Sequence, residues 1–136
     1  MIIYYEKDFK SLSLNGTQRE LIKIYEEIQK MMNNPALMQI QFHAEHKPSE
    51  WPNTTPLTSL IIKIGDTPIC VSIEDKTMVI TSSQRWLGNL SSYFDFRETG
   101  DPGYHVNLDV HWGNDCIHPD CIDTEIGIHY HNNSQR

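Results

Sequence analysis

Lysine and arginine are absent from residues 98 to 135. The same stretch holds five of the seven histidines and seven carboxylates: Glu98, Asp101, Asp109, Asp115, Asp120, Asp123 and Glu125. The first 97 residues are nearly neutral, so the formal net charge of -7 belongs almost entirely to the last third of the chain. Such one-sided charge repels nucleic acid and anionic membranes, and it attracts a metal ion or a basic protein.

Long apolar runs are also absent, and the longest ones, such as Leu60-Ile61-Ile62, are far too short to cross a bilayer. The N-terminal residues 1–6 contain neither a basic region nor a cleavage site of the secretory type. Three cysteines are too few for a disulfide framework, which fits a reducing compartment. We therefore expect one cytoplasmic domain spanning residues 1–136 and no membrane partner.

Two segments have the spacing of amphipathic helices. The first begins at Thr17, forms a capping box with Glu20, and ends near Asn33-Asn34-Pro35. Ser82 or Ser83 is positioned to cap the second helix, whose apolar residues run from Trp86 to Phe94. Residues 7–16, between the first strand and the first helix, read as a polar connection.

The remaining apolar segments alternate as strands do. They are residues 2–5, 38–44, 60–64, 69–73 and 78–80, with the last three forming an antiparallel meander through a hairpin at Gly65-Asp66. The proline-rich loop around Trp51 is expected to lie outside regular structure and to fold onto the core as a lid. The alternative is that Trp51 is exposed and serves as an interaction anchor. The pattern predicts an α+β fold: a mainly antiparallel sheet of about six or seven strands with both amphipathic helices packed on one face.

The acidic third contains two further alternating strands, residues 104–112 and 122–130. If they pair across the intervening loop, one register places His105 near His129, Asp109 near Glu125 and His111 near Asp123. A one-residue slip would invert both faces, so every register that keeps the apolar faces together also keeps the polar faces together. The sequence therefore predicts a polar, acidic sheet face.

Four functions compete for this face. The first is a metal site, because histidines and carboxylates are ligands for zinc or iron. The second is acid–base catalysis, with His111 beside Asp123 as an oriented base. No complete metal fingerprint, nucleophile or glycine-rich phosphate loop accompanies them, and the loop from Cys116 to Cys121 is a single weak knuckle. The third function is a docking surface that imitates the phosphates expected by a basic nuclease cleft, and the fourth is solubility alone. The missing lysine and arginine favour docking.

The segment Gly103-Tyr104-His105-Val106-Asn107-Leu108-Asp109, followed by Asp123-Thr124-Glu125-Ile126-Gly127-Ile128, resembles the closing strands of one α+β group of immunity proteins. These small acidic proteins neutralise the toxins of bacterial contact-dependent growth inhibition and polymorphic toxin systems. The resemblance implies direct binding to a cognate toxin domain, with a nuclease as the expected toxin, and no enzymatic activity. It covers about the last third of the chain.

Docking assigns roles to eight residues. The expected charged anchors are Asp109, Asp123 and Glu125, supported by His105, His111 and His129 and by the aromatic residues Trp112 and Tyr130. No metal or cofactor is expected. The alternative is a small metal-dependent enzyme or metal-binding protein that uses His105, His111, His129 and a carboxylate.

Overall fold

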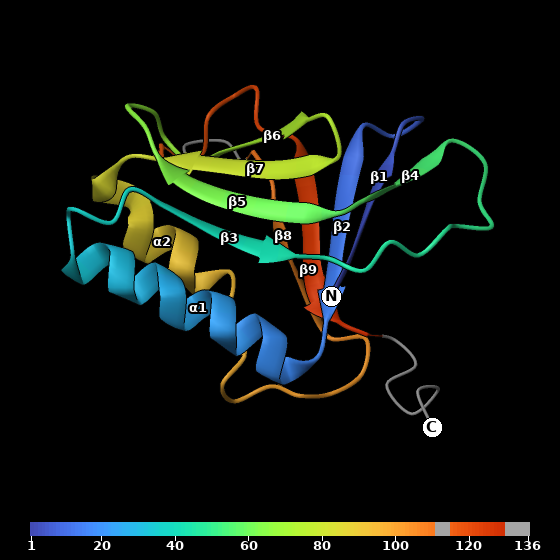
Figure 1. Ribbon diagram of the computed structural model, residues 1–136, viewed down its shortest axis with the longest axis horizontal. Coiled ribbons are helices and arrows are strands. Elements are labelled where there is room, and N and C mark those ends of the chain that lie inside the picture. The colour runs from blue at the N-terminus through green and yellow to red at the C-terminus, as the bar shows by residue number, and fades with distance from the viewer. Residues whose placement is uncertain (111–114, 130–136) are drawn as a thin grey trace.

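The computed structural model describes residues 1–110 and 115–129, which form two mixed β-sheets and two α-helices (Figure 1). The strands are β1 (Ile2–Glu6), β2 (Ser11–Gly16), β3 (Gln39–His43), β4 (Thr54–Leu57), β5 (Ser59–Ile64), β6 (Cys70–Glu74), β7 (Thr77–Ser82), β8 (His105–Leu108) and β9 (Asp123–Ile128). The helices are α1 (Gln18–Asn33) and α2 (Leu87–Ser92), the latter preceded by a 3-10 turn at Gln84–Trp86. The α+β class is thereby confirmed.

The expected single, mainly antiparallel sheet is wrong. One sheet has five strands in the order β4-β1-β2-β9-β8, and the other has four in the order β3-β5-β7-β6. Each contains one parallel pair, β2 with β9 and β5 with β7. The predicted meander fails because β7 lies between β5 and β6, so the turn at Gly65-Asp66 does not join neighbouring strands.

Helix α1 starts where the capping box predicts. The Thr17 hydroxyl accepts a hydrogen bond from the Glu20 backbone N–H at 3.1 Å, and the Glu20 carboxylate accepts one from the Thr17 N–H at 2.9 Å. Its buried stripe is Leu21, Ile24, Ile28 and Met31. The second helix is shorter than expected because its first turn is 3-10.

Two strands occur where the sequence indicates irregular structure. Leu12 and Leu14 of β2 are buried between the serines and asparagine of that strand, so residues 11–16 are not a polar connection. Strand β4 carries Pro56 at the outer edge of the five-stranded sheet, where a missing N–H is tolerated. Together with β1, these two strands belong to the same sheet as β8 and β9 of the acidic last third of the chain.

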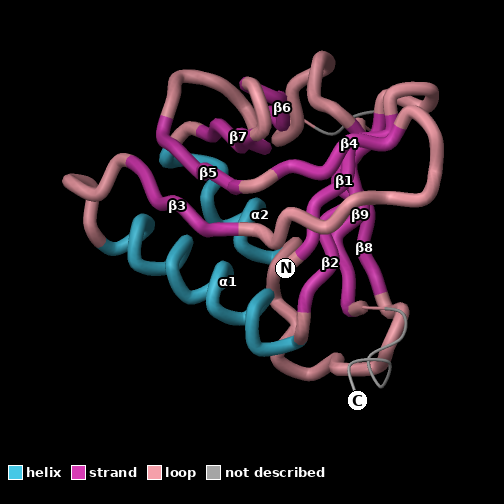
Figure 2. The backbone as a smooth tube through the Cα atoms, turned by 45° about the vertical axis from the view of Figure 1, so that its right-hand side comes forward, coloured by secondary structure: helices cyan, strands magenta, loops and turns pink. Residues whose placement is uncertain are grey.

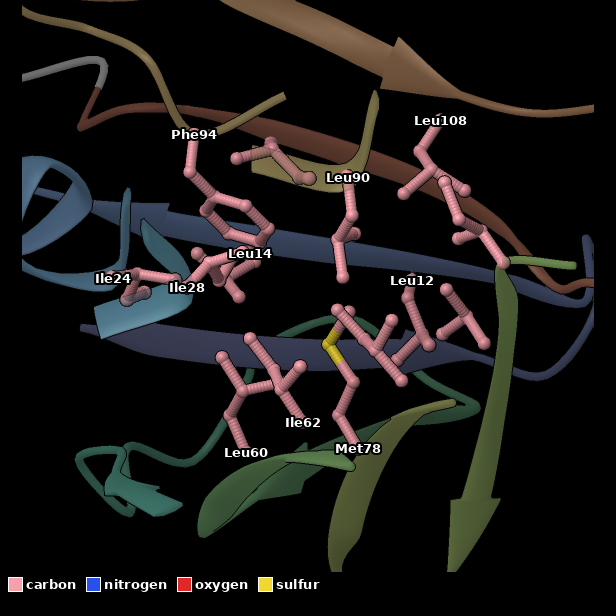
Figure 3. Packing of buried hydrophobic residues seen from close by; sticks show 14 of the residues in the cluster. Leu12, Leu14, Ile24, Ile28, Leu60, Ile62, Met78, Leu90, Phe94 and Leu108 are labelled. Atoms are coloured by element: carbon pink, nitrogen blue, oxygen red, sulfur yellow. The ribbon is translucent and has the colours of Figure 1, made fainter. Parts of the chain in front are cut away.

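Both sheets and both helices bury their apolar residues in a common core, and Figures 1 and 2 show the strands of the two sheets crossing beside the helices. Figure 3 shows Leu12 and Leu14 facing Leu60, Ile62 and Met78 across this core. Within residues 1–110 and 115–129, no helix has the length and apolar character needed to span a membrane.

The loop that contains Cys116 and Cys121 covers the edge of β6. The Ile69 N–H donates to the Cys116 carbonyl at 2.7 Å, and the Ile122 N–H donates to the Val71 carbonyl at 3.0 Å. Both cysteines are buried, and burial raises the pKa of Cys121 to about 11. The loop therefore covers the edge of β6, which would otherwise be exposed to solvent.

Candidate partner-binding face

Alternate residues of the five-stranded sheet point away from the core, and we call the surface that they form the outer face. Strand β9 shows the alternation most clearly, because Asp123 and Glu125 are exposed while Thr124 and Ile126 are buried. The register of the sheet places the following residues on the outer face: Tyr4, Glu6, Ser11, Ser13, Asn15, His105, Asn107, Asp123 and Glu125. None of them is lysine or arginine.

A hollow of about 350 Å³, here called the acidic hollow, opens on the outer face. Its lining comprises Glu6, Ser11, Leu12, Ser13, Asn15, Asn107, Asp109, Asp123, Thr124 and Glu125. Four of these residues are carboxylates, and no lysine or arginine lines the hollow. Three predicted anchors, Asp109, Asp123 and Glu125, therefore lie around one depression.

Three of the carboxylates of the acidic hollow, Glu6, Asp123 and Glu125, are exposed to little compensating charge from the described residues. Within residues 1–110 and 115–129, neither Glu6 nor Asp123 has a cationic group within 4.0 Å, and Glu125 approaches only the His105 Nε2, at 3.9 Å. Elsewhere in the fold, Asp95 pairs with Arg97 at 2.7 Å. Neighbouring carboxylates repel one another, which favours the binding of a cationic partner.

The pairing of β8 with β9 is confirmed as antiparallel, but its register differs by two residues from the predicted one. His105 lies opposite Gly127, and Asn107 lies opposite Glu125. A shift by two residues leaves every side chain on its original face, so the outer face keeps its acidic character.

His129 does not join the acidic hollow. It lines a separate hollow of about 620 Å³ near the first residue of the chain, together with Met1, Glu20, Glu45 and His46. The predictions for His111, Trp112 and Tyr130 lie outside the described residues. Of the two described histidines assigned to the face, His105 lies beside Glu125 and His129 does not.

The environment of His129 makes stability depend on pH. Burial lowers the pKa of His129, the Met1 α-amino group lowers it further, and Glu20 and Glu45 oppose the shift. Since the unfolded chain then binds a proton more readily than the folded one, folding stability should decline as pH falls below about 6.5. We expect His129→Asn to lose less stability than the parent protein between pH 7.5 and 5.5 in urea unfolding.

The exposed His105 provides the control for this experiment. His105→Asn should keep the decline of the parent protein, because this substitution leaves the half-buried His129 and its surroundings unchanged. An unchanged pH dependence in His129→Asn would contradict the assignment.

The contribution of β1 and β2 to the site was not predicted from the sequence. Glu6, Ser11 and Ser13 line the acidic hollow, and the alternation in Ser11-Leu12-Ser13-Leu14 was the signal that could have identified this strand. The lid interpretation of Trp51 is wrong, because 76% of its surface is exposed.

The acidic hollow offers carboxylate, hydroxyl and amide groups to a partner. In the described ranges, no three His, Cys, Asp or Glu side chains are grouped closely enough to hold a metal ion. The acid–base alternative depended on His111, which is not described. No family model, curated protein or solved structure matches this chain, so the resemblance to immunity proteins depends on its sequence: its size, its acidic balance, the absence of an enzymatic signature and the closing segments.

Proposed function

We propose that this protein is an immunity protein that binds a cognate toxin domain in the cytoplasm and neutralises it without turnover. The observation that carries the proposal is the acidic hollow, in which four carboxylates lie together with no lysine or arginine in the lining. A basic toxin domain provides cationic groups that complement this negative charge. A nuclease is the favoured toxin, since its cleft is built to bind phosphates.

The mixture of polar groups on the outer face supports a protein partner over a small ion. The carboxylates are separated by hydroxyl and amide groups from Ser11, Ser13, Asn15 and Asn107. Such groups donate and accept hydrogen bonds, so a partner surface can be matched both by charge and by direct contacts. A specific interface typically buries about 1,200–2,000 Å² in total, which requires the face around the hollow as well as the hollow itself.

The direct experiment asks whether the reading frame immediately upstream encodes a toxin domain that this protein neutralises. Cells that produce this domain should survive only when the protein is co-produced, and the two purified proteins should form a complex of fixed stoichiometry. Because opposite charges accelerate the encounter, the association rate should fall steeply as salt increases. Full toxin activity in the presence of excess protein would refute neutralisation of that domain.

Elemental analysis separates this proposal from the metal-dependent alternative. Protein purified without a histidine tag should contain no stoichiometric zinc or iron, and a chelator should leave its melting temperature unchanged. About one equivalent of metal together with a lowered melting temperature after chelation would favour the alternative.

A further inference from the structure

Phe9 and Trp51 are the most exposed large apolar side chains among the described residues, at 79% and 76%. They come from different loops: Phe9 lies in the turn between β1 and β2, and Trp51 lies in the segment that leads into β4. Both loops line one hollow of about 210 Å³, here called the aromatic hollow. Its lining comprises Glu6, Asp8, Phe9, Trp51, Pro52, Asn53 and Thr54.

Hydrogen bonds of Asn53 connect the two loops. The Asn53 carbonyl accepts a hydrogen bond from the Lys7 N–H at 2.9 Å, and its side-chain amide donates to both carboxylate oxygens of Asp8, at 3.0 and 3.3 Å. The backbone φ of Asn53 is 62°, in the left-handed region that asparagine tolerates better than most residues. The aromatic hollow is thus held in shape without a partner, which reduces the entropy lost on binding.

Two carboxylates line the aromatic hollow, and no lysine or arginine does. The Asn53 amide orients Asp8 but leaves its negative charge in place. Neither Glu6 nor Asp8 has a cationic group within 4.0 Å in the described part of the chain. Lys7 and Lys10 occupy the same turn but are not part of the lining.

The combination of aromatic rings and carboxylates suits a guanidinium group. Its flat faces stack on aromatic rings, and its N–H groups donate paired hydrogen bonds to carboxylates. A volume of about 210 Å³ is smaller than the roughly 300–1,000 Å³ of pockets for small molecules and cofactors, and it suits a single side chain.

We propose that the aromatic hollow binds an arginine side chain presented by a protein partner. Glu6 lines both this hollow and the acidic hollow, so the two form one continuous surface. The inference depends on the proposed function only for the identity of the partner. It adds an apolar anchor to a surface that otherwise offers charge, and exposed aromatic residues of this kind dominate binding energy at many interfaces.

The test uses two peptides as probes, acetyl-(Gly-Arg)4-amide and the same peptide with citrulline in place of arginine. Citrulline has nearly the same shape but no charge. In two-dimensional NMR spectra of the parent protein, the arginine peptide should shift the indole N–H signal of Trp51 and the side-chain amide of Asn53. The citrulline peptide should shift neither. Equal shifts with both peptides, or an unshifted Trp51 signal with arginine, would overturn the proposal.

Substitutions identify the groups responsible. Asp8→Asn should weaken binding of the arginine peptide by about tenfold, which corresponds to one charge-assisted hydrogen bond. Trp51→Leu should weaken it too, because an apolar side chain without a ring remains. The control Asp66→Asn removes an exposed carboxylate elsewhere and should bind as the parent does. Parent-like binding by both Asp8→Asn and Trp51→Leu would overturn the proposal.

The outcomes for this site and for the proposed function are separable. If the toxin domain is neutralised but Trp51 does not respond to the arginine peptide, the aromatic hollow is refuted and the immunity function stands. If the peptide binds as described and no toxin is neutralised, the arginine site stands and the function fails.

Discussion

Replacing Asp123 and Glu125 together with lysine should abolish neutralisation of the toxin while leaving the protein folded. Both side chains are exposed on β9 and line the acidic hollow, so neither substitution disturbs the core. The variant replaces two attractive charges with two repulsive ones at the centre of the proposed interface. Loss of such pairs costs about 2–5 kcal/mol, which weakens binding roughly 30-fold or more.

We choose this pair over one that includes Asp109, because Asp109 is half-buried and one of its oxygens is enclosed. Replacing Asp109 with lysine could destabilise the fold, so a loss of binding in that variant could not be separated from a loss of stability. Isothermal titration against the purified toxin domain measures the affinity, and urea unfolding verifies that the variant remains folded.

A matched control changes the net charge equally at a distance from the outer face. Asp66→Lys combined with Glu74→Lys also replaces two exposed carboxylates, and both belong to the four-stranded sheet and its loops. This control should bind and protect like the parent protein, with only a modest slowing of association. Equal protection by the Asp123 and Glu125 variant would show that the outer face is a solubility surface and that the interface lies elsewhere.

Replacing Gly127 with alanine should destabilise the protein and weaken its partner binding at the same time. A Cβ atom at this position would lie 2.7 Å from both the His105 Cβ and the Tyr104 carbonyl oxygen. That oxygen accepts a hydrogen bond from the Ile128 N–H at 2.9 Å, so it cannot retreat without a loss in backbone pairing. Overpacking of this kind costs about 1–3 kcal/mol.

The binding defect follows from the position of Gly127 in the sheet. It lies opposite His105 on β8, and relief of the clash must displace β8. This strand supplies Asn107 to the acidic hollow, and its continuation supplies Asp109. Gly88→Ala in α2 is the control, because its added Cβ would meet only the Met32 methyl group at 3.5 Å. Alanine is the better helix former, so this variant should gain up to about 1 kcal/mol. A Gly127→Ala protein as stable as the parent would contradict the predicted clash.

Local patterns correctly predicted those elements whose signals lie within a few residues of one another. The capping box at Thr17 defines the start of α1, and the alternation in residues 39–43 identifies β3. Strand β2 was missed because only Leu12 and Leu14 mark it among polar neighbours. The parallel pairing of β2 with β9 joins segments more than 100 residues apart, and no short-range pattern contains that information.

The exposure of Trp51 is another feature that short-range sequence patterns could not predict. A tryptophan among prolines is compatible with a lid or with a docking anchor, and the decision depends on where the loop lies after folding. In the structure, the Asn53 hydrogen bonds attach this loop to the β1–β2 turn, beside Phe9 and away from the core.

The sequence by itself determined that the closing strands have one acidic face, because side chains alternate along a strand and no lysine or arginine occurs between residues 98 and 135. It could not determine what lies beside that face. The tertiary structure places β2 next to β9 and β1 next to β2, which adds Glu6 and a row of serine and asparagine side chains to the hollow. Tertiary structure alone decides this, since the choice of a neighbouring strand depends on how the whole core is buried.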